Sequence, residues 1–163
     1  MKQYRIFCFC LLLLWSNAWN ACNWLWKPDR IGWIPFDSKQ DAFDFELCDE
    51  ERARQGQIYH PRYQEGKRDL RAYLLQEAQD LHFQLGESGH ITLRFLVNCK
   101  GQSGRFRVEQ LGSDYKTKIF DGAIVDVLLQ GVQQIENWEL PPEQDGFAVI
   151  TCKIKDGQLV DVI

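Results

Sequence analysis

The sequence lacks the short motifs by which common active sites are recognised. It contains no CxxC, HExxH, GxSxG or P-loop pattern, and no pair of carboxylates falls in an identifiable catalytic motif. The histidines His60, His82 and His90 are not spaced as metal ligands with one another or with cysteine. We therefore expect surface or strand-edge histidines, a solvated acidic run at 49–51, no catalytic or metal site, and no cofactor.

Positive charge is also scarce and scattered. The 163 residues include 19 Lys and Arg against 23 Asp and Glu, which gives a formal net charge of −4. Binding to a nucleic acid backbone requires a basic stripe. We interpret Lys67 and Arg71 as part of a solvated helix face, and Arg105 and Arg107 as the outward sides of a strand. The composition therefore argues against nucleic acid as a partner.

The N-terminal apolar run is too short to span a bilayer comfortably. This run, residues 6–15, follows Lys2 and Arg5 and precedes small residues at 16–18, an order typical of a secretory signal peptide. We predict cleavage after residue 18, which leaves a periplasmic or secreted chain. Two alternatives remain: lipid attachment at Cys22, although the preceding residues match a lipoprotein signal poorly, and an uncleaved anchor.

Cysteine is sparse once a signal peptide is removed. Four cysteines remain in the exported part: Cys22, Cys48, Cys99 and Cys152. If the last strand lies antiparallel beside the first, Cys99 faces the start of that strand near Phe147. Cys152 then lies several residues away, at about 3.3 Å per residue, which is beyond the reach of a disulfide. We therefore predict a Cys22–Cys48 disulfide and buried free thiols at Cys99 and Cys152; lipidation of Cys22 would exclude that disulfide.

Alternation of apolar and polar residues predicts strands in the second half of the chain. Residues 91–99 alternate, 100–104 form a glycine-rich turn, and the alternation resumes at 105–109, which together indicate a β-hairpin. A last alternating run covers 147–155. The following Asp-Gly turn leaves open a short fourth strand at 159–163.

Helical spacing brackets the hairpin. Apolar residues recur at helical intervals in 66–83 and again in 120–135, where Asp121 is placed to cap the helix. The order is helix, strand, strand, helix, strand. We predict an α+β fold in which two helices cover one face of a three-stranded antiparallel sheet.

The region between the signal and this fold is rich in aromatic residues. Its aromatic residues include Trp19, Trp24, Trp26, Trp33 and Phe36. This density is too high for a flexible spacer, and the segment is short for a domain. We divide the chain into residues 1–18, an N-terminal extension at 19–58, and a domain at 59–163. The extension either packs its aromatics on the domain or exposes them to a partner or sugar.

Several short motifs occur in an order that resembles a known family. They are the run Pro61-Arg62-Tyr63-Gln64-Glu65-Gly66, the strand from Gly89 to Val97 with Gly101 after it, and Trp138 with Pro141 and Gly146. Over residues 60–163 the chain resembles the C-terminal domain of TonB-type energy transducers. It departs from a complete transducer because no long Pro-rich spacer and no uncleaved anchor are visible.

The resemblance implies a peptide-binding role for the last strand. In the family this strand accepts a short extended segment of an outer-membrane receptor, and a free strand edge is a template for such addition. The role maps onto Phe147, Val149, Thr151, Lys153 and Lys155. The expected function is a non-catalytic module that binds an envelope or outer-membrane transport protein. The alternative is a structural envelope protein or lipoprotein whose edges are covered by its own extension or, as a homodimer, by a second copy.

Overall fold

The computed structural model describes residues 32–78, 86–136 and 138–163, which belong to one compact unit. The predicted signal peptide, Cys22 and the aromatic residues before Gly32 lie outside the described residues. The end of the predicted helix at 79–83, which includes His82, lies outside them as well.

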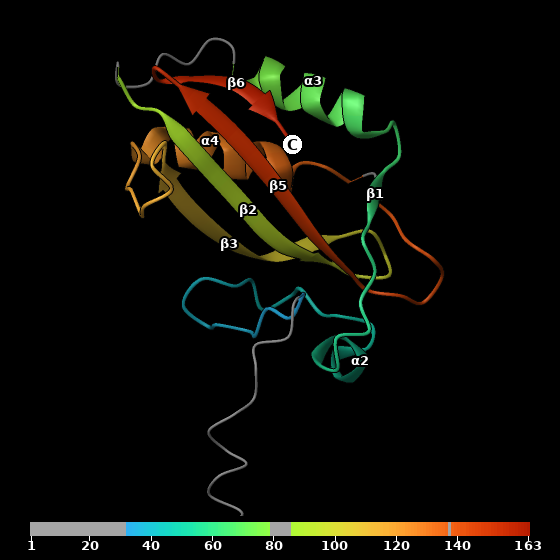
Figure 1. Ribbon diagram of the computed structural model, residues 1–163. Helices are drawn as coiled ribbons and strands as arrows, with labels where there is room; N and C mark the ends of the chain where they lie inside the picture. The colour runs from blue at the N-terminus through green and yellow to red at the C-terminus, as the bar shows by residue number, and fades with distance from the viewer. Residues whose placement is uncertain (1–31, 79–85, 137) are drawn as a thin grey trace, which may run out of the picture. The chain divides into compact units, whose positions relative to one another are not determined.

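The described residues form an α+β fold, as predicted (Figure 1). Four antiparallel strands form the large sheet in the order β3-β2-β5-β6. These strands are β2 (Gly89–Val97), β3 (Ser103–Gly112), β5 (Gly146–Lys155) and β6 (Gln158–Val162). The helices are α2 (Glu50–Arg54), α3 (Lys67–Glu77) and α4 (Gly122–Gln133), and a small sheet pairs β1 (Arg62–Tyr63) with β4 (Trp138–Glu139). The fourth strand is present as β6, whereas the small sheet and α2 were not predicted.

Helices α3 and α4 cover one face of the large sheet, as the alternation predicted. Ile91, Leu93 and Phe95 of β2 are fully buried in a core that includes residues of both helices. The register between β2 and β5 is continuous from Gly89↔Ile154 to Val97↔Gly146. The predicted cap of α4 is also confirmed, because the Asp121 side chain accepts a hydrogen bond from the Ala123 N–H.

The opposite face of the sheet is covered by residues 32–54 of the extension (Figure 1). Ile34 and Phe45 are buried there against Leu96 of β2 and Phe147 of β5. Phe45 approaches so closely that a side chain at Gly104 would overlap its ring. The part of the extension that the structure describes therefore packs on the domain.

Two arginines that we expected on the outward side of β3 are instead covered by the extension. Arg105 is only 7% exposed, and its guanidinium donates two hydrogen bonds to Glu50 and one to the Ile34 carbonyl. Arg107 makes a two-pronged ion pair with Asp41. Both side chains point away from the helices, as predicted, but they contact the extension rather than solvent. Alternation along a strand does not show which segment covers its outer face.

The predicted disulfide is wrong, because Cys48 is bonded to Cys99, with a Cα–Cα distance of 5.9 Å. Strand β2 ends at Val97, so Cys99 lies in the hairpin turn rather than on the core face. The extension brings Cys48 to this turn. Cys152 is a buried free thiol, as predicted, and burial raises its pKa to about 12.

A buried carboxylate holds the two ends of this disulfide region together. Asp145 accepts hydrogen bonds from the backbone N–H groups of Cys48, Asp49 and Cys99, at 3.0, 2.8 and 3.1 Å. A disulfide persists in an oxidising environment, which indicates a non-cytoplasmic compartment. None of the helices in the described ranges is long and apolar enough to cross a membrane.

Candidate binding groove at the edge of the large sheet

The outer edge of β5 is paired at both ends. At its start, the Phe147 N–H donates to the Tyr59 carbonyl at 2.8 Å, and the Tyr59 N–H donates to the Asp145 carbonyl at 3.0 Å. Towards its end, Thr151 and Ile163 exchange two hydrogen bonds, and the ladder with β6 continues from there. Tyr59 and β6 thus cover most of an edge that we expected to be free.

Between these paired parts, the edge is open at a single residue. In an antiparallel strand, alternate residues direct their backbone groups to the same side. Because Phe147 and Thr151 bond outwards, Val149 does so as well. Among the residues that the structure describes, the outward N–H and C=O of Val149 have no backbone partner. We call this opening the edge gap.

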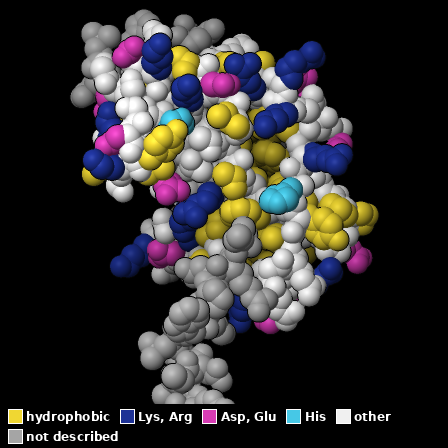
Figure 2. All heavy atoms as spheres, viewed as in Figure 1, with side chains coloured by type: hydrophobic (Ala, Val, Ile, Leu, Met, Phe, Trp, Pro, Cys, Tyr) yellow, Lys and Arg dark blue, Asp and Glu magenta, His cyan; other side chains and the backbone are white. Residues whose placement is uncertain are grey.

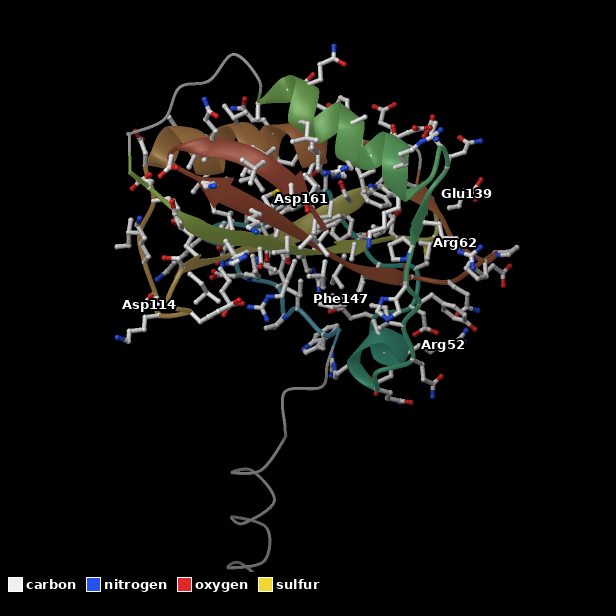
Figure 3. The ribbon with its side chains drawn as sticks, turned by 45° about the horizontal axis from the view of Figure 1, so that its top comes forward. Arg52, Arg62, Asp114, Glu139, Phe147 and Asp161 are labelled. Carbon is white, nitrogen blue, oxygen red and sulfur yellow. A yellow bond between two sulfur atoms is a disulfide. The ribbon has the colours of Figure 1, made fainter. Side chains whose placement is uncertain are left out.

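The predicted partner-binding residues differ in the exposure of their side chains and in the pairing of their backbone groups. Phe147 lies on the side of the sheet away from the helices (Figure 3). It is buried there under Ile34 and Phe45 of the extension. Val149 is 47% exposed. The Thr151 hydroxyl is hydrogen-bonded to Thr92 at 3.1 Å, and its backbone is paired with Ile163. Lys153 and Lys155 are exposed but pair with β6. Within the described part of the chain, Val149 is therefore the residue of this edge whose outward N–H and C=O both lack a backbone partner.

A largely apolar groove of about 420 Å³ runs beside the edge gap. On the helix side of β5 it is lined by Ala148 and Ile150, with Leu70 of α3 and Trp138 of β4 among the facing residues. Figure 2 shows hydrophobic side chains grouped in the middle of one face of the molecule. We call this cavity the edge groove.

The small sheet builds one wall of the edge groove. Tyr63 of β1 pairs with Trp138 of β4, and their rings meet edge-on with centroids 6.1 Å apart. Trp138 also packs on Phe95 of the core, at 5.4 Å between centroids. Its indole N–H is buried and has no hydrogen-bond partner within the described part of the chain. Burial raises the pKa of the Tyr63 hydroxyl above its ordinary value of 10.0.

The opposite wall is fixed by an ion pair between α3 and β6. Arg71 donates from Nε to Asp161 at 2.7 Å, and this hydrogen bond lowers the pKa of the Asp161 carboxyl. Val162 and Ile163 follow directly and line the edge groove. The pair therefore holds the end of β6 at the position where it closes one side of the edge gap.

Basic side chains surround the mouth of the edge groove. His60, Arg62 and Lys67 line it, and no aspartate or glutamate does. His60 Nδ1 lies 3.3 Å from the Phe147 carbonyl oxygen, which accepts a hydrogen bond when that nitrogen carries the proton. Arg62 lies opposite Glu139 in the small sheet (Figure 3). No ion pair between those two, or to Lys67, occurs in the described ranges.

The edge groove combines three kinds of contact that bind polypeptide chains. The edge groove offers apolar surface, two open backbone groups and positive charge, and its lining contains no cysteine or serine. No group of three or more His, Cys, Asp and Glu within the described residues is arranged to hold a metal ion.

Several groove residues were not predicted from the sequence. They are His60, Tyr63, Trp138 and Ile163, together with Tyr59, which pairs beside the edge gap. A single aromatic residue close to a proline, in each of the segments 61–63 and 138–141, was the available signal. Two-residue strands are too short to show periodicity. Comparisons of the chain with protein-family models, curated proteins and solved structures found no match.

Proposed function

We propose that this chain is an exported, non-catalytic protein-interaction module that binds an extended peptide segment by strand addition at Val149. The observation that carries the proposal is the edge gap. Within the described residues, the two outward backbone groups of Val149 have no backbone partner between Tyr59 and Ile163, and they lie beside an apolar groove. Unpaired strand edges accept extended peptides through main-chain hydrogen bonds.

The edge gap limits how much peptide can pair. From Phe147 to Thr151 there are four residue steps, or about 13 Å at the usual strand rise. Tyr59 and Ile163 occupy the edge on either side. A bound segment therefore pairs over about three residues and then turns away from the sheet at both ends. This contact is shorter than the addition of a whole strand.

The small number of hydrogen bonds makes the edge groove essential to affinity. Two backbone hydrogen bonds to Val149 contribute about 1–3 kcal/mol in total. Micromolar binding requires about 8 kcal/mol. The remainder has to come from peptide side chains, and residues on either side of the one paired with Val149 direct their side chains to the helix side. The edge groove lies on that side, along Ala148 and Ile150.

The proposed partner is a segment of a cell-envelope protein in the periplasm. The disulfide is consistent with an oxidising compartment. The resemblance to TonB-type C-terminal domains supports an outer-membrane transport protein as the partner.

The proposal can be tested by panning a phage-displayed peptide library against the full chain, produced under oxidising conditions. Val149→Pro removes the outward N–H, whereas Val149→Ala shortens the side chain and keeps that N–H. We expect peptides that bind wild type and Val149→Ala but are lost with Val149→Pro. Thr151→Pro is a poorer probe because the Thr151 N–H already bonds to Ile163. Equal binding to all three folded proteins would count against strand addition.

A second candidate is a structural envelope protein that covers its own edges. It is favoured by β6 and Tyr59, which pair with most of the outer edge of β5. No residue in 32–47 pairs with 147–155, and residues 19–31 of the extension lie outside the described residues. Absence of any Val149-dependent peptide, together with a stable homodimer in sedimentation experiments, would favour this candidate.

A further inference from the structure

The charge of the edge groove is opposite to that of the chain as a whole. The sequence has more acidic than basic residues, yet the groove lining contains His60, Arg62 and Lys67 and no carboxylate side chain. The absence of carboxylates from the lining does not reflect a lack of acidic residues nearby in the sequence. Glu65, Glu139 and Asp161 are all close in the sequence to groove residues but do not line the groove. Positive charge is therefore concentrated where the backbone is open.

Two of the nearby acidic residues, Asp161 and Glu139, form no ion pair with Arg62 or Lys67 in the described ranges. Asp161 is engaged by Arg71 at 2.7 Å, on the α3 side of β6. Glu139 faces Arg62 across the small sheet but forms no ion pair with it within the described ranges. Lys67 is exposed at the start of α3 and likewise has no ion-pair partner there. An incoming carboxylate would meet two cations without displacing an existing ion pair.

The apolar part of the groove lies next to these cations. Leu70, Trp138 and Ile150 lie deeper, and the volume of about 420 Å³ is within the range of sites that enclose a drug-sized ligand. A peptide residue that neighbours the one paired with Val149 can place a large side chain there. The next position towards β1 then lies near Arg62 and Lys67.

Resting on the proposed strand addition, we infer that the partner segment combines a large apolar or aromatic side chain with an acidic residue one or two positions away. The apolar side chain fills the edge groove between α3, β4 and β5. The carboxylate lies at the mouth, on the β1 side. A basic segment is disfavoured, because its positive charge would be repelled by Arg62 and Lys67. The direction of the peptide decides which of the two residues comes first.

The test uses the same phage library with charge-reversed groove variants of the full chain. We expect Val149-dependent peptides from wild type to be enriched in an aromatic or large aliphatic residue next to Asp or Glu. Arg62→Glu combined with Lys67→Glu should weaken these peptides about tenfold and select Lys- or Arg-containing ones instead. Arg68→Glu is the matched control, because Arg68 is adjacent on α3 but is 93% exposed and does not line the groove.

Each outcome separates the two proposals. Val149-dependent peptides without acidic enrichment, or unchanged selection by the double variant, would overturn the charge preference while strand addition stands. An equal shift with Arg68→Glu would also overturn it, because the effect would then come from net charge rather than the groove. No Val149-dependent peptide at all would overturn both.

Discussion

The two faces of the large sheet are held by different kinds of interaction. The helix face is an apolar core, in which Leu93 and Phe95 are fully buried against α3 and α4. The extension face has a small apolar cluster, supplemented by two arginine–carboxylate pairs on β3, the Cys48–Cys99 disulfide and the Asp145 hydrogen bonds.

This difference suggests that the two faces have different stabilities. Burial on the helix face is spread over many side chains, so its loss should unfold the whole domain. The extension depends on a few polar and covalent contacts, each of which is removable by one substitution. We expect the extension to loosen locally before the sheet and helices unfold. The predictions below address this contrast, from the largest expected effect to the smallest.

Phe95→Ala tests the helix face. Phe95 is fully buried and packs on Phe106 and Trp138 at 5.0 and 5.4 Å between ring centroids. Its truncation leaves a cavity and should lower the free energy of unfolding by about 3–5 kcal/mol. Denaturant unfolding measures the loss, and Phe43→Ala is the control, because Phe43 is 76% exposed. Similar losses in both variants would contradict the assignment of the core.

Replacing both cysteines of the disulfide with serine tests the covalent contact. The disulfide links residues 51 apart, and its removal should lower the free energy of unfolding by about 2–4 kcal/mol. Hydrogen exchange should quicken first in residues 32–58 and in the hairpin turn, while amides of β2 and β5 stay protected. Uniform loss of protection across the sheet would show that the two faces unfold as one unit.

Arg105→Gln tests the polar contacts of the extension. The substitution removes the two hydrogen bonds to Glu50, and we expect it to lower the free energy of unfolding by about 1–3 kcal/mol. The estimate is below that for a fully buried pair because Glu50 is partly exposed. Arg54→Gln is a matched control: Arg54 also lies over the Trp33 ring but pairs with Glu51 in solvent. An equal effect of both substitutions would mean that burial of Arg105 adds nothing.

The same contrast explains which parts of the fold could be predicted from sequence. Alternation and helical spacing report burial on one face, so β2, β5 and α4 were predicted, and the short β6 was considered as an optional fourth strand. They carry no information about what covers the other face. Arg105 has φ of +53° next to a register shift between β2 and β3, a local bulge that no pattern in the sequence announces.

The edge groove was predictable only in part, for a related reason. Val149 was one of five residues of the last strand to which the resemblance assigned partner binding, and its outward backbone groups have no backbone partner among the described residues. The limits of the opening depend on Tyr59, which forms a single bridge to Gly146, and on β6. Such contacts between segments far apart in the chain arise from tertiary packing and leave no periodic signal.

The smallest expected effect is the pH dependence of the Asp41–Arg107 pair. The hydrogen bond from Arg107 lowers the pKa of the Asp41 carboxyl from its ordinary value of 3.8, and the Asp37 N–H acts in the same direction. The pair therefore stabilises the folded state fully above that value, and this contribution is lost as the pH falls through the lower folded pKa. Denaturant unfolding at several pH values should show a shallower decline below pH of about 4 for Asp41→Asn than for wild type. Asp44→Asn, on the same exposed loop, controls for loss of a carboxyl group. If both variants follow wild type in acid, the Asp41–Arg107 pair adds specificity of position rather than stability, and the extension is held by its other contacts.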